Sequence, residues 1–250
     1  MFDNLFIKGI TYDKENVPNN NIYPFNIEAI KNLDSIKLNK NVTFFIGENG
    51  VGKSTFIEAI AVALKLNPEG GTQNFSFKTK DTHSNLADYI RVLGTGNLPD
   101  TKFFLRAESF YNVATEIIDI SENGGQRPIY EYYGGNLHEC SHGESFINLV
   151  KNRFSDNGLY ILDEPEAALS PSRQMALLCL IDDLVKRGSQ FIISTHSPIL
   201  LSYSNADIYD LNNNFKKVDY KDTEIYKTYK MFLDNPDRML NLLLNNSEES

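Results

Sequence analysis

The architecture can be predicted from one continuous run, Val42-Thr43-Phe44-Phe45-Ile46-Gly47-Glu48-Asn49-Gly50-Val51-Gly52-Lys53-Ser54. Its first part is short, apolar and rich in β-branched and aromatic residues, which is typical of a buried strand. The second part fits the spacing G-x-x-x-x-G-K-[ST], in which a glycine-rich loop joins a strand to a helix. Residues 53–66 keep apolar side chains on one face and precede Pro68, Gly70 and Gly71, so a helix is expected there.

The loop in this run has the chemistry of a phosphate site. Glycines allow a tight turn that brings backbone N–H groups to phosphate oxygens, and the helix N-terminus adds free donors. Lys53 is expected to reach the β- and γ-phosphates, and Ser54 to bind Mg²⁺. A glycine-rich turn that fits the spacing by chance is the alternative, which the flanking strand and helix disfavour. The predicted nucleotide-binding residues are Gly47, Asn49, Gly50, Val51, Gly52, Lys53, Ser54 and Thr55, although Thr55 could equally cap the helix.

Two further apolar runs, 159–162 and 191–193, also predict buried strands, and a polar turn follows each of them. Between them, residues 172–187 predict a helix with Ser170 as N-cap, Pro171 in its first turn and Gly188 as its stop. This order favours a mostly parallel sheet flanked by helices, with its chemistry at the carboxyl edge of the strands.

The strand at 159–162 runs into two acidic residues, Asp163 and Glu164. Hard cations prefer oxygen ligands, so Asp163 is expected to hold Mg²⁺ directly or through a water. Successive strand side chains point to opposite faces, which leaves Glu164 to orient and deprotonate an attacking water. An ordinary surface acid pair would be the better interpretation if the phosphate loop were not present.

His196 follows the strand at 191–193. An imidazole at that edge could hydrogen-bond both the γ-phosphate and the attacking water. Most isolated histidines are structural, and that reading is retained for His83, His138 and His142.

The whole chain, 1–250, is predicted to be one α/β domain. Its core is assigned to 1–81 and 149–244. The glycine-rich segment 82–148 is expected to be an inserted, mostly helical lobe.

Composition restricts the class of protein further. The net charge of −9 argues against a generally basic surface that coats nucleic acid. The two cysteines, Cys140 and Cys179, have no metal-ligand spacing and are expected to be reduced thiols. No run of about 18 apolar residues and no export signal is seen, so we expect no membrane insertion and a cytoplasmic location.

The segment Ser141-His142-Gly143-Glu144-Ser145 lies before the acidic strand. Together with the phosphate loop, Asp163-Glu164-Pro165 and His196, it resembles the ATP-binding cassette (ABC) ATPases over nearly the whole chain. The similarity is greatest to small, stand-alone bacterial ATPases of the predicted AAA-family kind, on the evidence of residues 104–110, 141–145 and 164–171. The resemblance implies a P-loop NTPase fold, ATP and Mg²⁺ as ligands, and ATP hydrolysis.

In the wider family, the signature segment of one protomer closes over ATP held by the other. The resemblance therefore implies an ATP-dependent homodimer. In it, Ser141, the backbone of Gly143 and the adjacent Glu144 would contact the γ-phosphate across the interface.

The sequence departs from the transporter pattern at three points. The signature is Ser-His-Gly-Glu rather than Ser-Gly-Gly-Gln, which resembles the chromosome-maintenance and DNA-repair branch. Ser170 stands where the family often has aspartate, which weakens the expected cross-dimer contact of that loop. No glutamine is evident for the loop that links magnesium to the helical lobe. Glu108 is preferred over Arg106 for this role, and an ordinary surface acid is an equal alternative at Glu108.

An aromatic side chain near the N-terminus is expected to stack on adenine. Tyr12, Tyr23 and Phe25 are candidates, and for each a place in the core is the stronger alternative.

The functional prediction is an ATPase that drives conformational change on a macromolecular partner. The partner would be DNA or an effector protein, in repair or anti-phage defence. One alternative is the nucleotide-binding motor subunit of a membrane transporter, and another is an ATP-dependent switch without turnover. The absence of an Asn/Thr-Lys-x-Asp segment makes a GTPase the weaker choice.

Overall fold

A computed structural model describes residues 5–68, 70–71, 84–108, 110 and 142–245 of the chain. Its centre is a six-stranded sheet with the strand order β5-β6-β7-β3-β8-β9. The first five of these strands are parallel, and β9 pairs antiparallel with β8. The strands are β3 (Val42–Ile46), β5 (Thr101–Arg106), β6 (Gly158–Asp163), β7 (Gln190–Ser194), β8 (Ala206–Asp210) and β9 (Lys216–Lys217).

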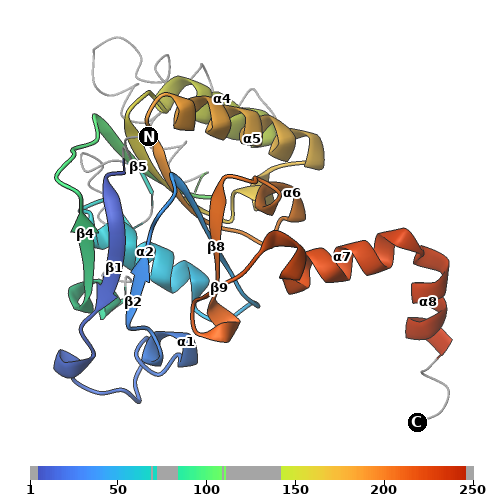
Figure 1. Cartoon of the computed structure of the whole chain (residues 1–250), viewed down its shortest axis with the longest axis horizontal. Helices are drawn as coiled ribbons and strands as arrows, with labels where there is room; N and C mark the ends of the chain where they lie inside the picture. Colours follow the sequence, from blue (N-terminus) through green and yellow to red (C-terminus); the bar gives the residue numbers. More distant parts are fainter. Residues whose placement is uncertain (1–4, 69, 72–83, 109, 111–141, 246–250) are drawn as a thin grey trace.

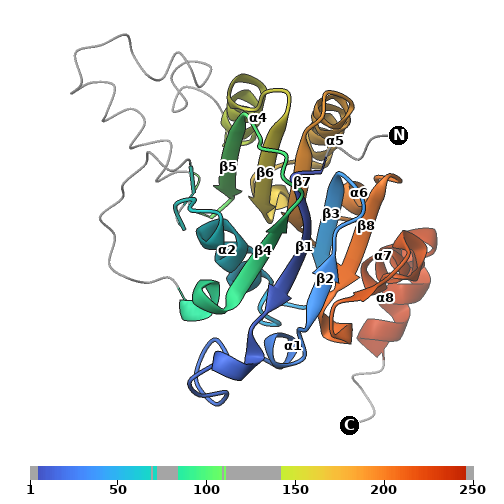
Figure 2. The ribbon, with the colours of Figure 1, turned by 60° about the vertical axis from the view of Figure 1, so that its left-hand side comes forward.

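A smaller antiparallel sheet lies in front of the first in Figure 2, with the order β2-β1-β4. Its strands are β1 (Ile7–Tyr12), β2 (Ser35–Lys37) and β4 (Ile90–Gly94). Helix α2 (Lys53–Ala63) contacts both β4 and the central strands β6 and β7, so it lies between the two sheets. Phe45 and Phe56 meet edge to face in the core on this side.

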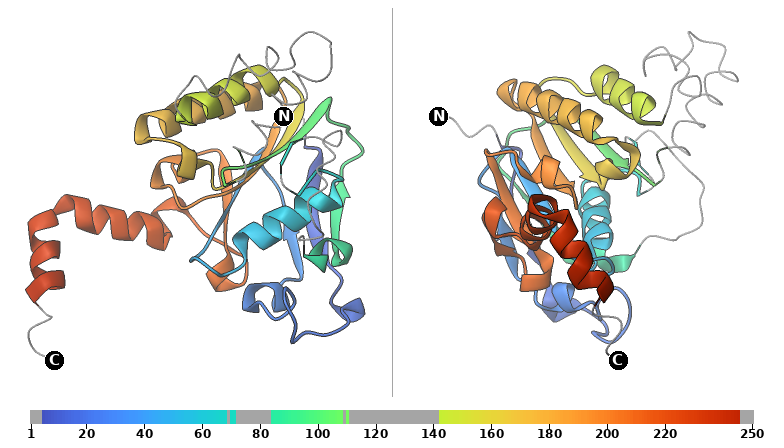
Figure 3. Two further views of the ribbon diagram at one scale, coloured as in Figure 1. Left: turned by 180° about the vertical axis from the view of Figure 1, so that it is seen from behind. Right: turned by 90° about the vertical axis from the view of Figure 1, so that its right-hand side faces the viewer.

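The opposite face of the six-stranded sheet is covered by α4 (His142–Arg153), α5 (Pro171–Lys186) and α6 (Pro198–Leu201). Figures 1 and 3 show α4 and α5 side by side over this face. Because side chains alternate along a strand, Phe44 faces these helices while Phe45 faces α2. The ring of Tyr160 stacks on Phe154 just after α4, at a centroid distance of 3.9 Å, which fixes the end of that helix against β6.

Short elements connect these layers. They are α1 (Glu28–Lys31) and the 3-10 helices η1 (Lys14–Asn16), η2 (Asn85–Tyr89), η4 (Pro165–Ala168), η5 (Leu211–Asn213) and η6 (Tyr220–Asp222).

The described chain ends in two helices, α7 (Glu224–Asp234) and α8 (Pro236–Asn245), which project away from the body in Figure 1. We call residues 224–245 the C-terminal arm. Both helices are amphipathic, yet the arm buries no side chain completely, and Leu233 and Leu244 are 67% and 65% exposed. None of the described helices combines the length and apolarity needed to cross a bilayer.

The predicted fold class is confirmed, and all three predicted strands are present as β3, β6 and β7. Helix α2 ends earlier than expected, at Ala63, because Lys65 adopts a left-handed φ of 63°. Helix α5 begins at Pro171 with Ser170 in the N-cap position and ends before Gly188, which has a φ of 87°. The side chain of Ser170 makes no capping hydrogen bond.

The predicted lobe boundary at residue 82 needs correction. Residues 84–108 form η2, β4 and β5, and β5 is the edge strand of the central sheet rather than part of a helical lobe. Phe103, Phe104 and Leu105 are all buried because this strand is covered on both faces, which hides the alternation expected of a strand. Most of the remaining segment, 109–141, lies outside the described residues.

Candidate functional site

The predicted motifs meet at one edge of the six-stranded sheet. Strand β7 pairs with both β3 and β6, and Ser194 at its end lies opposite Phe45 and Asp163. The carboxyl ends of parallel strands share an edge, so the loops that follow β3, β6 and β7 are neighbours there. Residues that are far apart in the sequence are thereby brought within contact distance.

The loop after β3 wraps around the ammonium group of Lys53. Its Nζ donates hydrogen bonds to the carbonyl oxygens of Gly47 and Glu48, both at 3.0 Å. Gly52, the N-cap of α2, has a φ of 99°, and a Cβ there would lie 2.9 Å from Cγ2 of Ile27. Only glycine meets both constraints without strain, so the second glycine of the motif is a requirement of the fold.

Lys53 is a buried cation beside several carboxylates. Burial lowers the pKa of Lys53, and the opposite charges of Glu164, Asp163 and Glu166 counteract that effect. The Nζ of Lys53 lies 3.8 Å from Oε1 of Glu164. An ammonium held in this way is directed at the mouth of the loop, where a phosphate group would add further negative charge.

The carboxylate of Asp163 is buried and accepts hydrogen bonds on both oxygens. Oδ1 accepts from Ser194 Oγ at 2.5 Å and from Ser54 Oγ at 3.3 Å. Oδ2 accepts from Arg106 Nε at 2.9 Å. The other end of the Arg106 guanidinium pairs with Glu58 of α2 at 3.1 Å. Burial lowers the pKa of Arg106, but the two carboxylates outweigh burial and raise it.

The oxygens of Ser54 and Asp163 form a donor set that suits Mg²⁺. Both are hard oxygen ligands, and Asp163 at the end of β6 contacts Ser54 in the first turn of α2, where phosphates are expected. Mg²⁺ commonly takes its other ligands from phosphate and water. Among the described residues, no group of three or more His, Cys, Asp or Glu side chains could hold a metal ion without such help. The residues therefore fit a magnesium ion that arrives with a nucleotide.

Glu164 stands at the centre of the loops. It has a left-handed φ of 49°, which turns the chain sharply from β6 into η4. Its Oε1 lies 3.6 Å from Nε2 of His196. The neighbouring imidazole of His196 has the largest effect on the pKa of Glu164 and lowers it, burial raises it, and Lys53 lowers it further. Glu164 is thus an ionised carboxylate near neutral pH, as a general base must be.

A hollow of about 510 Å³ lies beside the phosphate loop. Its lining residues are Tyr23, Ile27, Asn49, Gly50, Gly52, Lys53, Ser54, Thr55, Glu108 and Glu164. Glu108 therefore faces the same hollow as Lys53, although it is Arg106 that contacts Asp163. Tyr23 is 64% exposed and its hydroxyl lies 3.0 Å from Oγ1 of Thr55, whereas Tyr12 and Phe25 are buried. Of the three aromatic candidates, Tyr23 is the one beside the loop.

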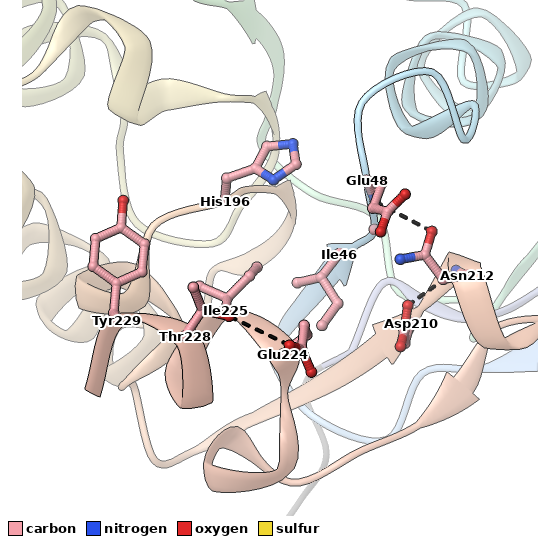
Figure 4. A pocket seen from close by; sticks show the side chains of 10 residues that line it. Ile46, Glu48, His196, Asp210, Asn212, Glu224, Ile225, Thr228 and Tyr229 are labelled. Atoms are coloured by element: carbon pink, nitrogen blue, oxygen red, sulfur yellow. Dashed lines mark hydrogen bonds between the residues drawn. The ribbon is translucent and has the colours of Figure 1, made fainter. Parts of the chain in front are cut away.

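A second hollow, of about 340 Å³, opens on the other side of the loop (Figure 4). His196, Gly47 and Glu48 form one wall, and the first turns of α7 form the opposite wall, including Thr228 and Tyr229. Val51, the remaining predicted nucleotide-binding residue, lines neither hollow; it is half-buried and packs against the core. The C-terminal arm therefore begins at the margin of the candidate site.

The signature residues lie apart from these hollows. Gly143 and Glu144 are in the first turn of α4, where a Cβ on Gly143 would lie 2.8 Å from Cδ of Arg173, and Glu144 forms a 3.1 Å ion pair with the same arginine. Neither residue lines either hollow. Ser141 lies outside the described residues.

Sequence reasoning missed Glu58 and Glu166, and it ranked Arg106 below Glu108. Glu58 is four residues after Ser54 on the same helix, so helical spacing was an available signal. The partnership of Arg106 with Asp163 depends on the pairing of β5 with β6, which places the two residues opposite each other.

Comparison with known proteins places these features in a family. A family model described as an AAA domain matches residues 20–163, and one described as an AAA ATPase domain matches residues 141–201. The energy-coupling factor transporter ATP-binding protein EcfA of Methanosphaera stadtmanae is 28% identical over 203 residues, which is 74% of this chain and 71% of that protein. The cytochrome c biogenesis ATP-binding export protein CcmA of Rhizobium etli is 27% identical over 194 residues, or 70% and 87% of the two chains.

Solved structures with a similar arrangement include the SMC head domain from Thermotoga maritima, with a TM-score of 0.42, 16% identity and coverage of 82% of this chain and 95% of that one. Another is cbiO1 from Clostridium perfringens, part of the ABC transporter complex cbiONQ. Its TM-score is 0.44, with 18% identity and coverage of 84% and 90%. The first family model spans more than half of the sequence and contains the phosphate loop together with Asp163. The chain therefore belongs to the AAA-domain family of P-loop ATPases, and within it to the ATP-binding cassette type.

Proposed function

We propose that this protein binds ATP with Mg²⁺ in the hollow beside the phosphate loop and hydrolyses it. One observation carries the proposal: three strand ends bring their groups together. Glu164 lies within 4 Å of both Lys53 and His196, and Asp163 accepts a hydrogen bond from Ser54, the residue next to Lys53. A structural ion-pair network would not need a glycine-rich phosphate loop in its midst.

In this proposal each side chain has a separate task. Lys53 neutralises charge on the β- and γ-phosphates, and Ser54 and Asp163 hold Mg²⁺, which when bound neutralises the charge that develops on the transferred phosphoryl group. Glu164 orients a water molecule and accepts its proton as the oxygen attacks the γ-phosphorus, while the bond from that phosphorus to the β–γ bridging oxygen breaks and ADP leaves. His196 donates a hydrogen bond to a γ-phosphate oxygen. Asn49, Gly50, Val51, Gly52 and Thr55 supply the surrounding loop.

We propose further that the site is completed by a second copy. Gly143 and Glu144 do not line the hollow of their own chain, so a role for them at the γ-phosphate requires another protomer. Ser141, next to them in the sequence, is assigned the same role across the interface. ATP would then stabilise the dimer, and hydrolysis would release it, because the nucleotide binds the closed state better.

The relatives indicate which kind of partner the proposed ATPase acts on. EcfA and CcmA are described as ATP-binding proteins of transport or export systems, which favours the transporter alternative over action on DNA. The proposal for the partner is accordingly a membrane transporter whose cytoplasmic face docks this chain. The DNA-repair and anti-phage reading rests on the Ser-His-Gly-Glu signature alone.

Glu164→Gln tests the catalytic proposal. The substitution keeps the size of the side chain but removes the base, so phosphate release should fall by about 10²–10⁴-fold while ATP affinity is retained. Light scattering should then detect an ATP-dependent dimer that wild type forms only transiently. Wild-type turnover in the variant would refute the role of Glu164, and a monomer in saturating MgATP would refute the shared site.

The partner is tested separately with the Glu164→Gln protein as bait in detergent-solubilised membranes. Recovery of a transmembrane protein in the presence of ATP, and not with Lys53→Ala as bait, is the expected result. ATP-dependent DNA binding that weakens steeply with salt would instead support the DNA reading, since phosphate contacts release counterions.

A further inference from the structure

The backbone around His196 belongs to no regular element. Strand β7 ends at Ser194 and α6 begins at Pro198. The N–H of Thr195 still donates to the carbonyl of Phe45, and the carbonyl of Ser197 accepts from Leu201, but in the described chain the N–H of His196 donates to no backbone oxygen. Thr195 is fully buried and His196 is half-buried, where unpaired backbone groups are costly. A side chain must therefore accept from the N–H of His196 if the backbone that carries the imidazole is to be held in place.

Glu166 supplies that contact to His196. Its Oε1 accepts a hydrogen bond from the backbone N–H of His196, which links the loop after β6 to the loop after β7. The second oxygen, Oε2, is buried and has no hydrogen-bond partner among the described residues. Burial raises the pKa of Glu166. In the described chain Glu166 forms no ion pair with Lys or Arg.

Stability alone does not account for a carboxylate in this position. A buried carboxylate that forms no direct ion pair costs free energy, and its hydrogen bond to the backbone amide of His196 only partly offsets that cost. Such groups concentrate at functional sites.

Gln174 makes a second link between the same loops, one residue further on. Its Oε1 accepts from Ser197 Oγ at 2.6 Å, and its Nε2 donates to the carbonyl of Leu169 at 3.0 Å. Ser197 in turn caps α6 by accepting from Ile199 and Leu200. Gln174 thus holds the start of α6, whereas Glu166 acts on His196 itself, and the pair offers a matched comparison.

We propose that Glu166 is a positioning residue for His196, holding the backbone of the histidine so that its imidazole faces Glu164 and the γ-phosphate. This inference rests on the proposed function, because it assigns His196 a part in turnover. Glu166 lies on the 165–170 loop, which was expected to face the second copy. A movement of that loop when the copy docks would therefore be transmitted to His196 through one hydrogen bond.

The test compares Glu166→Met, which keeps the volume and removes the acceptor, with Glu166→Gln, which keeps an acceptor oxygen. Glu166→Met should lower kcat by about 10–100-fold with KM nearly unchanged, the usual effect of misplacing a reacting group. Glu166→Gln should stay within about 3-fold of wild type, as should the control Gln174→Met. In a His196→Ala background, Glu166→Met should cause no further loss, because the group it positions is gone.

A wild-type kcat in Glu166→Met, equal losses in the Met and Gln variants, or a loss that adds to that of His196→Ala would each overturn the inference. The ¹⁵N chemical shifts of the His196 imidazole can be measured without ATP hydrolysis. They should differ from the wild-type values in Glu166→Met and match them in Glu166→Gln. If the wild type releases no phosphate, the proposed function fails while this measurement still decides the role of Glu166. Glu166→Ala replaces the Met variant if the latter does not fold.

Discussion

The loops at the edge of the central sheet and the C-terminal arm differ in how their side chains are held. At the edge, Asp163 accepts three side-chain hydrogen bonds, and Lys53 is enclosed by the loop that it binds. Along the arm, Leu233, Leu243 and Leu244 are exposed, and the ion pair of Lys230 with Asp234 is local. The two regions lie against each other at the hollow between His196 and α7 (Figure 4).

This contrast indicates which side chains of the molecule are conformationally restricted. The edge combines burial with several contacts per group, so few conformations are open to it. A helix of the length of α8 is marginal in water unless an apolar face is covered, and none of the described side chains of α8 is buried. Substitutions of the same residue type should therefore have large effects at the edge and small effects in the arm.

The largest effect is expected from Arg106→Leu. The arginine pairs with both Glu58 and Asp163, whose side chains are 14% and 3% exposed, and its removal leaves one half-buried and one buried carboxylate without their ion-pair partner. The free energy of unfolding should fall by about 3–5 kcal/mol in urea denaturation. In the arm, Arg238→Leu should change it by less than about 0.5 kcal/mol. If the two variants lose similar amounts of unfolding free energy, the sheet edge and the arm do not differ in how strongly their side chains stabilise the fold.

Lys53→Ala should affect turnover almost as strongly. In the proposed function its ammonium neutralises phosphate charge, and losing such a group should lower kcat by about 10²–10³-fold, together with a loss of ATP affinity. Phosphate release and fluorescent-ATP titration measure the two effects. Lys230→Ala in α7 is the control and should leave both unchanged. A Lys53→Ala protein with normal affinity would mean that ATP binds elsewhere.

Gly52→Ala tests the shape of the phosphate loop. Its left-handed φ and the close approach of Ile27 should together cost about 1–3 kcal/mol of unfolding free energy. Gly96→Ala has nearly the same φ, 98°, with no atom within 4 Å, so it isolates the backbone term at about 1 kcal/mol. Equal destabilisation of the two proteins would show that the Ile27 contact relaxes freely.

The smallest effect is expected from a stop after Asn235, which removes α8. No described side chain of α8 is buried, so the free energy of unfolding from urea denaturation should change by less than about 0.5 kcal/mol. Basal ATP hydrolysis should also be unchanged. A loss of several kcal/mol would mean that α8 stabilises the folded chain.

The predicted strands and motifs could be read from the sequence because each is encoded locally. Residues 42–46 are apolar on both faces, and Asp163 and His196 directly follow such runs. The partners of Asp163 could not be read in this way. Arg106 reaches Asp163 only because β5 pairs with β6, and the link from Glu166 to His196 crosses 30 residues of sequence.

The arm was overlooked for a different reason. Ile225, Tyr229 and Phe232 recur at helical spacing, which predicts an amphipathic helix, but the spacing does not tell whether the apolar face packs on the core. Its amphipathic pattern predicts a helix, and only the structure shows that the apolar face is exposed rather than packed.

Because of the left-handed turn at Glu164, stability and turnover favour different residues at this position. A long side chain with a positive φ is held in a disfavoured conformation, which glycine or asparagine would adopt more comfortably. Replacing Glu164 by glycine should therefore raise the melting temperature while removing the proposed general base. Selection for thermal robustness alone would drive this position away from glutamate, so heat tolerance and turnover are opposing demands on one residue.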